Sequence, residues 1–181
     1  MLFRSADGSI QGARFLVNST WDDTQSYAAI DSVDGGGFVV VWESANTDGS
    51  GWGVYGQRYG ADASSQGGEF LINTTTSSDQ REPAVAGLSG GGFVVTWISA
   101  GQDGSSNGIY AQRFNNAGMA QGSEFLVNSA TSGQQDVPNV LALTTGGFVI
   151  SWASNDSIDG SGWGVFAQEY DAAGNTVNDQ F

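Results

Sequence analysis

Residues 37–42 read Gly-Phe-Val-Val-Val-Trp, and this stretch decides the fold because it returns twice. It reappears at 92–97 as Gly-Phe-Val-Val-Thr-Trp and at 147–152 as Gly-Phe-Val-Ile-Ser-Trp, 55 residues apart each time. A fixed period of this length indicates a repeat architecture. Two further blocks recur in step with it, Phe-Leu-Val/Ile-Asn at 15–18, 70–73 and 125–128, and Val/Ile-Tyr/Phe-x-Gln-Arg/Glu-Tyr/Phe at 54–59, 109–114 and 165–170.

Each unit predicts four short antiparallel strands. In the middle unit they are expected at 84–88, 93–97, 109–114 and 124–128, separated by turns and loops rich in Gly, Ser and Asn. No stretch has the 3.6-residue apolar period of a helix. The second strand is apolar at consecutive positions, which is typical of a strand whose two faces are both covered.

A repeated four-stranded meander that is covered on both faces predicts the blade of an all-β, β-propeller-type fold. The alternative is a β-trefoil or a β-prism with three-fold pseudo-symmetry. The consecutive apolar positions favour the propeller, whereas the count of three repeats favours the alternative. We expect a single repeat domain over residues 1–181, with units at approximately 19–73, 74–128 and 129–181, and with residues 1–18 as a strand that completes a last blade.

The two ends of the chain carry complementary parts of the repeat. Residues 14–18 match the fourth-strand stretch at 69–73 without the three strands that should precede it. Open strand edges recruit further strands. We therefore expect a homo-oligomer, a ring or a filament, in which residues 15–18 of one chain lie beside residues 165–170 of another.

Composition excludes several functions. The 181 residues include 5 Lys or Arg against 19 Asp or Glu, for a net charge of −14, and neither Cys nor His occurs. Disulfides, Cys/His metal sites and Ser-His-Asp triads are therefore absent. Nucleic acid is not an expected partner, because phosphate binding needs clustered Lys and Arg. Membrane insertion is not expected either, because no run approaches the ~18 apolar residues of a membrane helix.

The repeat resembles a known family. Its consensus runs Gly-Gly-Phe-Val-Val-x-Trp, then Asp-Gly-Ser-Gly-x-Gly-Val/Ile-Tyr/Phe, then Glu-Phe-Leu-Val/Ile-Asn. This pattern is similar to the tandem repeats of large secreted bacterial adhesin-like exoproteins, which occur alongside calcium-binding repeat-in-toxin segments. The resemblance covers nearly the whole chain and implies an extracellular or cell-surface location, with calcium or glycan contact. The calcium nonapeptide Gly-Gly-x-Gly-x-Asp itself is absent.

A glycan-binding site is predicted on one face of the propeller. There, the loop between the second and third strands meets the linker between blades. Aromatic faces stack on sugar rings, and amide groups bond to sugar hydroxyls. The other interpretation is that Asp-Gly forms the turn and Trp caps the next blade. Trp42, Trp97 and Trp152 are separate from this site, because they end the core strand of each unit and are expected to pack in the core. The candidate ligand-binding residues are Trp21, Trp52, Trp163 and Asn107.

Calcium is a further candidate ligand, although no cofactor is required by the sequence. The candidate metal ligands are Asp48, Asp103 and Asp159, which open equivalent loops. Neighbouring loops would have to pool their oxygens, because hard cations need several such ligands. Turn formation explains the same residues.

Catalysis is not expected. Without His, Lys or Cys, only a carboxylate pair of the kind used in glycoside hydrolysis remains. Glu43 is replaced by Ile98 and Ala153 in the other units. The sequence thus predicts a non-catalytic, glycan-binding, adhesin-like module, with a self-assembling structural subunit as the alternative.

Overall fold

The computed structural model describes residues 14–20, 23–156 and 162–178. Within these ranges the protein contains eleven strands and no helix, so no described helix is available to span a bilayer. The absence of a described helix agrees with the sequence, which shows no helical period. The strands are β1 (Gln25–Val33), β2 (Gly37–Ala45), β3 (Trp52–Tyr59), β4 (Phe70–Leu71), β5 (Gln80–Gly87), β6 (Phe93–Ala100), β7 (Asn107–Phe114), β8 (Phe125–Leu126), β9 (Gln135–Ala142), β10 (Phe148–Ser154) and β11 (Gly164–Tyr170).

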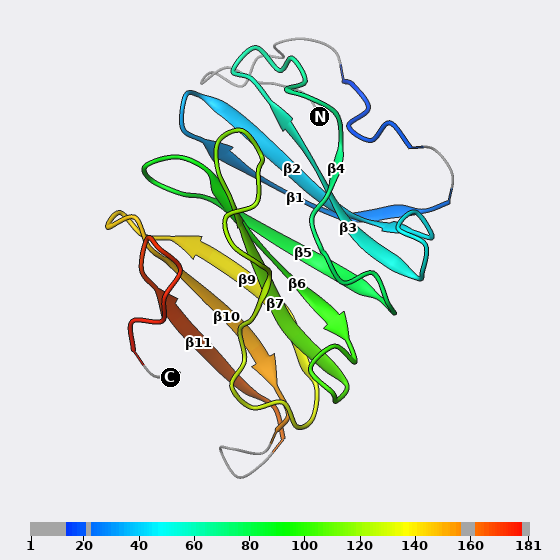
Figure 1. The fold of residues 1–181 in the computed structure, drawn as a ribbon, viewed down its shortest axis with the longest axis vertical. Coiled ribbons are helices and arrows are strands. Elements are labelled where there is room, and N and C mark those ends of the chain that lie inside the picture. Colours follow the sequence, from blue (N-terminus) through cyan, green and yellow to red (C-terminus); the bar gives the residue numbers. More distant parts are fainter. Residues whose placement is uncertain (1–13, 21–22, 157–161, 179–181) are drawn as a thin grey trace.

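The strands form three separate antiparallel sheets, which lie side by side in Figure 1. We call β1–β4 blade 1, β5–β8 blade 2 and β9–β11 blade 3. Consecutive strands pair within each blade, so each sheet is a meander. The all-β, blade-like prediction is therefore confirmed. Four strands are present in blades 1 and 2, but the described part of blade 3 has three, so a fourth strand in every unit is not found.

The first strand of each blade (β1, β5 and β9), which we call the inner strand, differs from the prediction because its pairing contains a bulge. β5 begins at Gln80 rather than at residue 84, and its register shifts between Arg81 and Ala84. Pro83 is accommodated there because an unpaired bulge position needs no N–H donor. The bulge residues have left-handed backbone, with φ of 50° at Tyr27, 52° at Glu82 and 54° at Val137.

The glycine that precedes each core strand is required by close packing. A Cβ on Gly37, Gly92 or Gly147 would lie 2.2–2.4 Å from a carbonyl oxygen at the end of the third strand of the same blade. Any larger residue would push these two strands apart. This contact explains why the Gly-Phe pair begins the block that decides the fold.

Burial follows the stacking of the blades. All residues of β6 from Phe93 to Ser99 are buried, because blades 1 and 3 cover its two faces. In β10, buried and half-buried residues alternate, since no described blade covers the second face of blade 3. Val165 on that face is 82% exposed, while Val54 and Ile109 at the equivalent positions are fully buried. Trp42, Trp97 and Trp152 lie in the core as predicted.

Residues 14–18 pack on blade 1. The ring of Phe15 lies 5.3 Å from that of Tyr59, just as Phe70 lies 5.8 Å from Phe114 in blade 2 and Phe125 lies 5.4 Å from Tyr170 in blade 3. The N-terminal segment therefore occupies the place of a fourth strand that belongs to a preceding blade. Within the described chain it does not pair with β11.

A buried network of amide and hydroxyl groups crosses each blade boundary, and we call it the amide stitch. Asn73, after β4, donates to Gln80 Oε1 at 3.2 Å, and Gln80 donates to Ser99 Oγ at 3.5 Å. Asn73 Oδ1 also accepts from the Val54 amide at 2.7 Å. The stitch therefore joins strands of blade 1 to strands of blade 2. It recurs as Asn18, Gln25 and Ser44, and as Asn128, Gln135 and Ser154.

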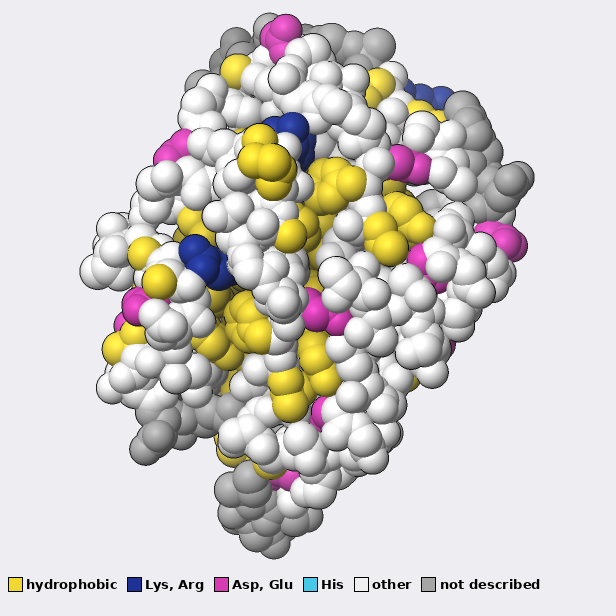
Figure 2. All heavy atoms as spheres, viewed as in Figure 1, with side chains coloured by type: hydrophobic (Ala, Val, Ile, Leu, Met, Phe, Trp, Pro, Cys, Tyr) yellow, Lys and Arg dark blue, Asp and Glu magenta, His cyan; other side chains and the backbone are white. Residues whose placement is uncertain are grey.

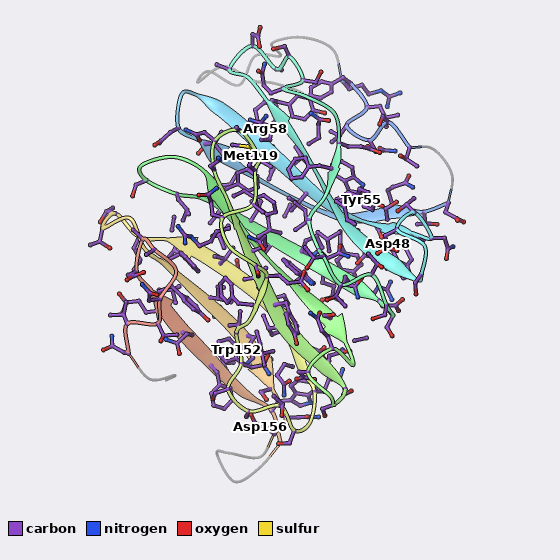
Figure 3. The ribbon with its side chains drawn as sticks, viewed as in Figure 1. Asp48, Tyr55, Arg58, Met119, Trp152 and Asp156 are labelled. Atoms are coloured by element: carbon purple, nitrogen blue, oxygen red, sulfur yellow. The ribbon has the colours of Figure 1, made fainter. Side chains whose placement is uncertain are left out.

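Arginine side chains also link neighbouring blades through hydrogen bonds. Arg58 of β3 donates to the Asn116 carbonyl in the turn after β7, and Figure 3 shows it beside Met119 of that turn. Arg113 of β7 donates to the Ala172 carbonyl of blade 3 at 2.7 Å. The repeated glutamines instead bond within their own blade; Gln57, for example, donates to the Arg58 and Gly67 carbonyls.

The face seen in Figure 2 carries no large patch of one charge. Hydrophobic side chains gather in its middle, over β3 and β7, and acidic and basic side chains are scattered singly around them. The high net negative charge is therefore not concentrated on this face.

Candidate functional site

A groove of about 330 Å³ opens between the inner strands of blades 2 and 3, and we call it the inter-blade groove. Its walls come from the starts of β5, β7 and β9 and from the C-terminal end of β6. Charged and amide side chains predominate among its lining residues, which are Asp79, Arg81, Glu82, Ile98, Ala100, Asn107, Gln134, Asp136 and Val137.

Two of the three left-handed bulge residues line this groove. Glu82 and Val137 occupy equivalent positions on adjacent inner strands, and Tyr27 holds that position in blade 1. Left-handed backbone is unfavourable for such side chains, above all for β-branched Val. Bulges re-aim side chains, and strained backbone clusters at functional sites. The bulges therefore make this end of the inner strands the leading candidate site.

Arg81 connects the groove to blade 1. Its Nη2 lies 3.5 Å from Oε1 of Glu43, and its guanidinium carbon lies 4.5 Å from the centre of the Trp52 ring. Trp52 in turn donates its backbone N–H to Asp79 Oδ1 at 3.2 Å. These contacts hold the guanidinium between an aromatic face and a carboxylate.

Glu82 is the groove carboxyl with the most perturbed environment. Burial raises its pKa, and the negative charges of Asp136 and Glu43 raise it further, while Arg81 opposes them. Its carboxylate makes no hydrogen bond with the described residues. Glu82 is therefore a carboxyl group that is easier to protonate than usual and is available to a ligand.

Asp136 is held in place by two amides. Its Oδ1 accepts from Asn107 Nδ2 at 2.9 Å, and its Oδ2 accepts from Gln134 Nε2 at 2.6 Å. These bonds fix the carboxylate in the groove opposite blade 2.

The structure brings some of the predicted ligand-binding residues to the groove and not others. Asn107 lines it, and Trp52 contacts it through Arg81 and Asp79. Trp163 immediately precedes β11, is 53% exposed and lies apart from the groove lining. Trp21 lies outside the described residues.

The predicted calcium ligands form turns. Asp48 Oδ1 accepts from the Ser50 amide at 3.2 Å, and Asp103 Oδ1 accepts from the Ser105 amide at 3.0 Å. Asp159 lies outside the described residues. Among the residues that are described, no group of three or more acidic side chains is close enough to hold a metal ion. Calcium binding remains a prediction.

The candidate site residues identified from the sequence did not include Arg81, Glu82 or Asp136. The available signal was the proline at positions 83 and 138, because proline inside a strand indicates a bulge.

Comparison with known proteins supports the propeller-like fold. No family model and no curated protein matches the chain. Solved structures do match, each with low sequence identity. An endo-arabinase from Bacteroides thetaiotaomicron has a TM-score of 0.53 at 13% identity, over 94% of this chain and 69% of that chain. An α-L-arabinofuranosidase from Lactobacillus brevis has a TM-score of 0.56 at 12% identity, over 94% and 59%. A protein of unknown function from Dyadobacter fermentans has a TM-score of 0.63 at 10% identity, over 87% and 54%.

These similarities define the class as an all-β, propeller-like fold that occurs in glycoside hydrolases. The chain spans only about half to two-thirds of the length of these structures. Our expectation that the chain is not an enzyme is overturned, because the fold is shared with an arabinase and an arabinofuranosidase.

Proposed function

We propose that this protein binds carbohydrate in the inter-blade groove. The observation that carries the proposal is Glu82, a carboxyl on a strained bulge that lies between Arg81 and Asp136 and has no hydrogen bond of its own within the described chain. Carboxylates and amides bond to sugar hydroxyls. Asp136 and Asn107 supply these groups around Glu82, while the Trp52 ring packs against Arg81 outside the groove lining.

The charge of the groove favours a neutral saccharide. Asp79, Glu82 and Asp136 carry three carboxylates against the single guanidinium of Arg81. An anionic sugar, such as a uronate, would bring a further negative charge into a partly desolvated site, which is unfavourable. Since structures with this fold include an arabinase and an arabinofuranosidase, arabinose-containing saccharides are the first ligands to test.

Calorimetric titration of the full chain with arabinan oligosaccharides tests binding, with a polyuronate as the anionic comparison. Glu82→Gln should clearly lower the affinity, because a neutral amide oxygen is a weaker hydrogen-bond acceptor than a charged carboxylate. Glu69→Gln is the matched control, since Glu69 bonds to the Ser19 amide at 2.8 Å and does not line the groove. Wild-type protein that binds no arabinan oligosaccharide, or that loses binding equally in both variants, would refute the site.

Glycoside hydrolysis is the second candidate function. Hydrolases use a pair of carboxyl groups, one of them with a raised pKa, as acid and base or nucleophile. Glu82 would protonate the leaving oxygen, and Asp136 would assist on the other side of the bond. Release of reducing sugar from arabinan by wild-type protein, and its loss in both Glu82→Gln and Asp136→Asn, would establish the activity. Binding without release in wild type would leave carbohydrate recognition alone.

A further inference from the structure

Glu43 is a charged residue in the core between blades 1 and 2. Its side chain is fully buried, and the equivalent positions carry Ile98 and Ala153. A buried carboxylate is costly unless it is paired and hydrogen-bonded, so an apolar residue would serve packing better. The position therefore needs an explanation other than core formation.

Both oxygens of Glu43 are engaged by residues around the site. Oε1 accepts from Ser26 Oγ at 2.8 Å and pairs with Arg81. Oε2 accepts from the backbone amide of Glu82 at 2.9 Å. One carboxylate thus contacts both the bulge that carries Glu82 and the guanidinium that covers Trp52.

We propose that Glu43 is a positioning residue for the inter-blade groove: it anchors the left-handed bulge at Glu82 and holds Arg81 against Trp52. This inference rests on the proposed function of the groove. Tyr27 and Val137 have the same backbone conformation, but within the described chain neither bulge amide donates to a carboxylate. The anchor is found where the bulge residue is itself charged and lines the groove.

Glu43 also contributes to the field at Glu82. The charged groups that face Glu82 are Glu43 from β2, Asp136 from β9 and Arg81 from β5, with Asp79 at the entrance to β5. Removal of the negative charge of Glu43 leaves Asp136 and Arg81 in place. The pKa of Glu82 then falls toward its usual range, which a purely structural role for Glu43 would not produce.

Glu43→Gln in the full chain tests the proposal, with Glu124→Gln as the matched control. Glu124 also caps backbone, since it accepts from the Thr74 amide at 2.6 Å, but it does not line the groove. Carboxyl NMR without ligand should show a lower Glu82 pKa in Glu43→Gln only. Affinity for arabinan oligosaccharides should fall by about tenfold or more in this variant, equivalent to about 1.4 kcal/mol, and remain unchanged in the control.

The outcomes separate the two proposals. If wild type binds no saccharide, the proposed function fails, and the titration of Glu82 still decides whether Glu43 acts on it. If both variants lower thermal stability and neither changes the Glu82 titration, Glu43 is structural only and the inference is overturned.

A second variant covers the case in which Glu43→Gln does not fold. Glu43→Ile with Arg81→Leu replaces the whole ion pair by apolar side chains, a change that proteins often tolerate. Hydrogen exchange at the Glu82 amide should then become faster, because its acceptor is gone, and saccharide affinity should fall. Wild-type exchange and affinity in this double variant would also overturn the inference.

Discussion

At Gly87, the last residue of β5, the backbone of blade 2 closely approaches that of blade 1. A Cβ placed on Gly87 would lie 1.8 Å from the Ser32 carbonyl oxygen, far inside the 3.4 Å at which ordinary contact begins. The Gly87 amide also donates to Asp31 Oδ2 at 3.0 Å. Gly87→Ala must therefore separate the blades and weaken a bond to a charged acceptor.

The expected loss of stability follows from these two effects. Overpacking costs about 1–3 kcal/mol, and a hydrogen bond to a charged group contributes about 1.5–3 kcal/mol. We expect Gly87→Ala to lower the free energy of unfolding by about 3–5 kcal/mol, and the melting temperature by roughly 6–20 °C for a chain of this size. Urea denaturation followed by tryptophan fluorescence measures the first, and calorimetry the second.

Gly68→Ala is the control for the glycine substitution. No described atom lies within 4 Å of a Cβ at Gly68, and its φ is not left-handed. Its stability should stay within about 0.5 kcal/mol of wild type. If Gly87→Ala also stays within about 1 kcal/mol of wild type, the close approach of the blades does not constrain the fold and the reasoning is wrong.

Three further predictions concern the core, the groove and the face of blade 3 that no described blade covers. Trp97→Ala should lower stability by about 3–5 kcal/mol in denaturant titration, because its fully buried ring fills the interface of blades 1 and 2; a smaller loss than that of an exposed Trp163→Ala would contradict the core assignment. The raised pKa of Glu82 means that the folded state binds its proton more tightly than the unfolded state does, so stability is lost as pH rises through that pKa. The Glu82→Gln protein should therefore have a higher melting temperature than wild type at pH 7. The difference should vanish in thermal melts below pH 4.5, the usual pKa of a free Glu side chain. We propose that the chain self-associates through residues 15–18 and β11; Glu169 stands where Arg58 latches the next blade, so Glu169→Arg should strengthen association in light scattering, and monomers in both proteins would count against that contact.

The sequence predicts the blades because their signal is repeated three times. Gly-Phe blocks, consecutive apolar positions and core tryptophans all reflect packing that is nearly the same in every unit. The alternation in β10 could not be predicted, since its residues match those of β6 in type. The difference arises from the neighbouring blade, which covers both faces of β6 but one face of β10.

The groove was harder to predict because its residues are not repeated from unit to unit. Its distinctive residues Arg81 and Glu82, and the core residue Glu43 that contacts both, each occur in one unit and are replaced in the others. Left-handed backbone at Tyr27, Glu82 and Val137 is not signalled by residue type, since none of these is Gly or Asn. What the three positions share is an inner-strand bulge, and only the three-dimensional structure shows where its side chains gather.

The amide stitch has a consequence for how such a chain changes in length. Asn73 and Gln80 are seven residues apart, as are Asn18 and Gln25, and Asn128 and Gln135. An in-register gain or loss of one 55-residue unit by unequal recombination rejoins a matching Asn and Gln, so the new junction is already compatible with its neighbours. The contacts of Glu43 with Arg81 and Glu82 do not have this property, because they span two particular units. Gain of further units would therefore reproduce the Asn–Gln contacts at every new junction. The groove would be retained only when the two units that supply Glu43, Arg81 and Glu82 remain adjacent.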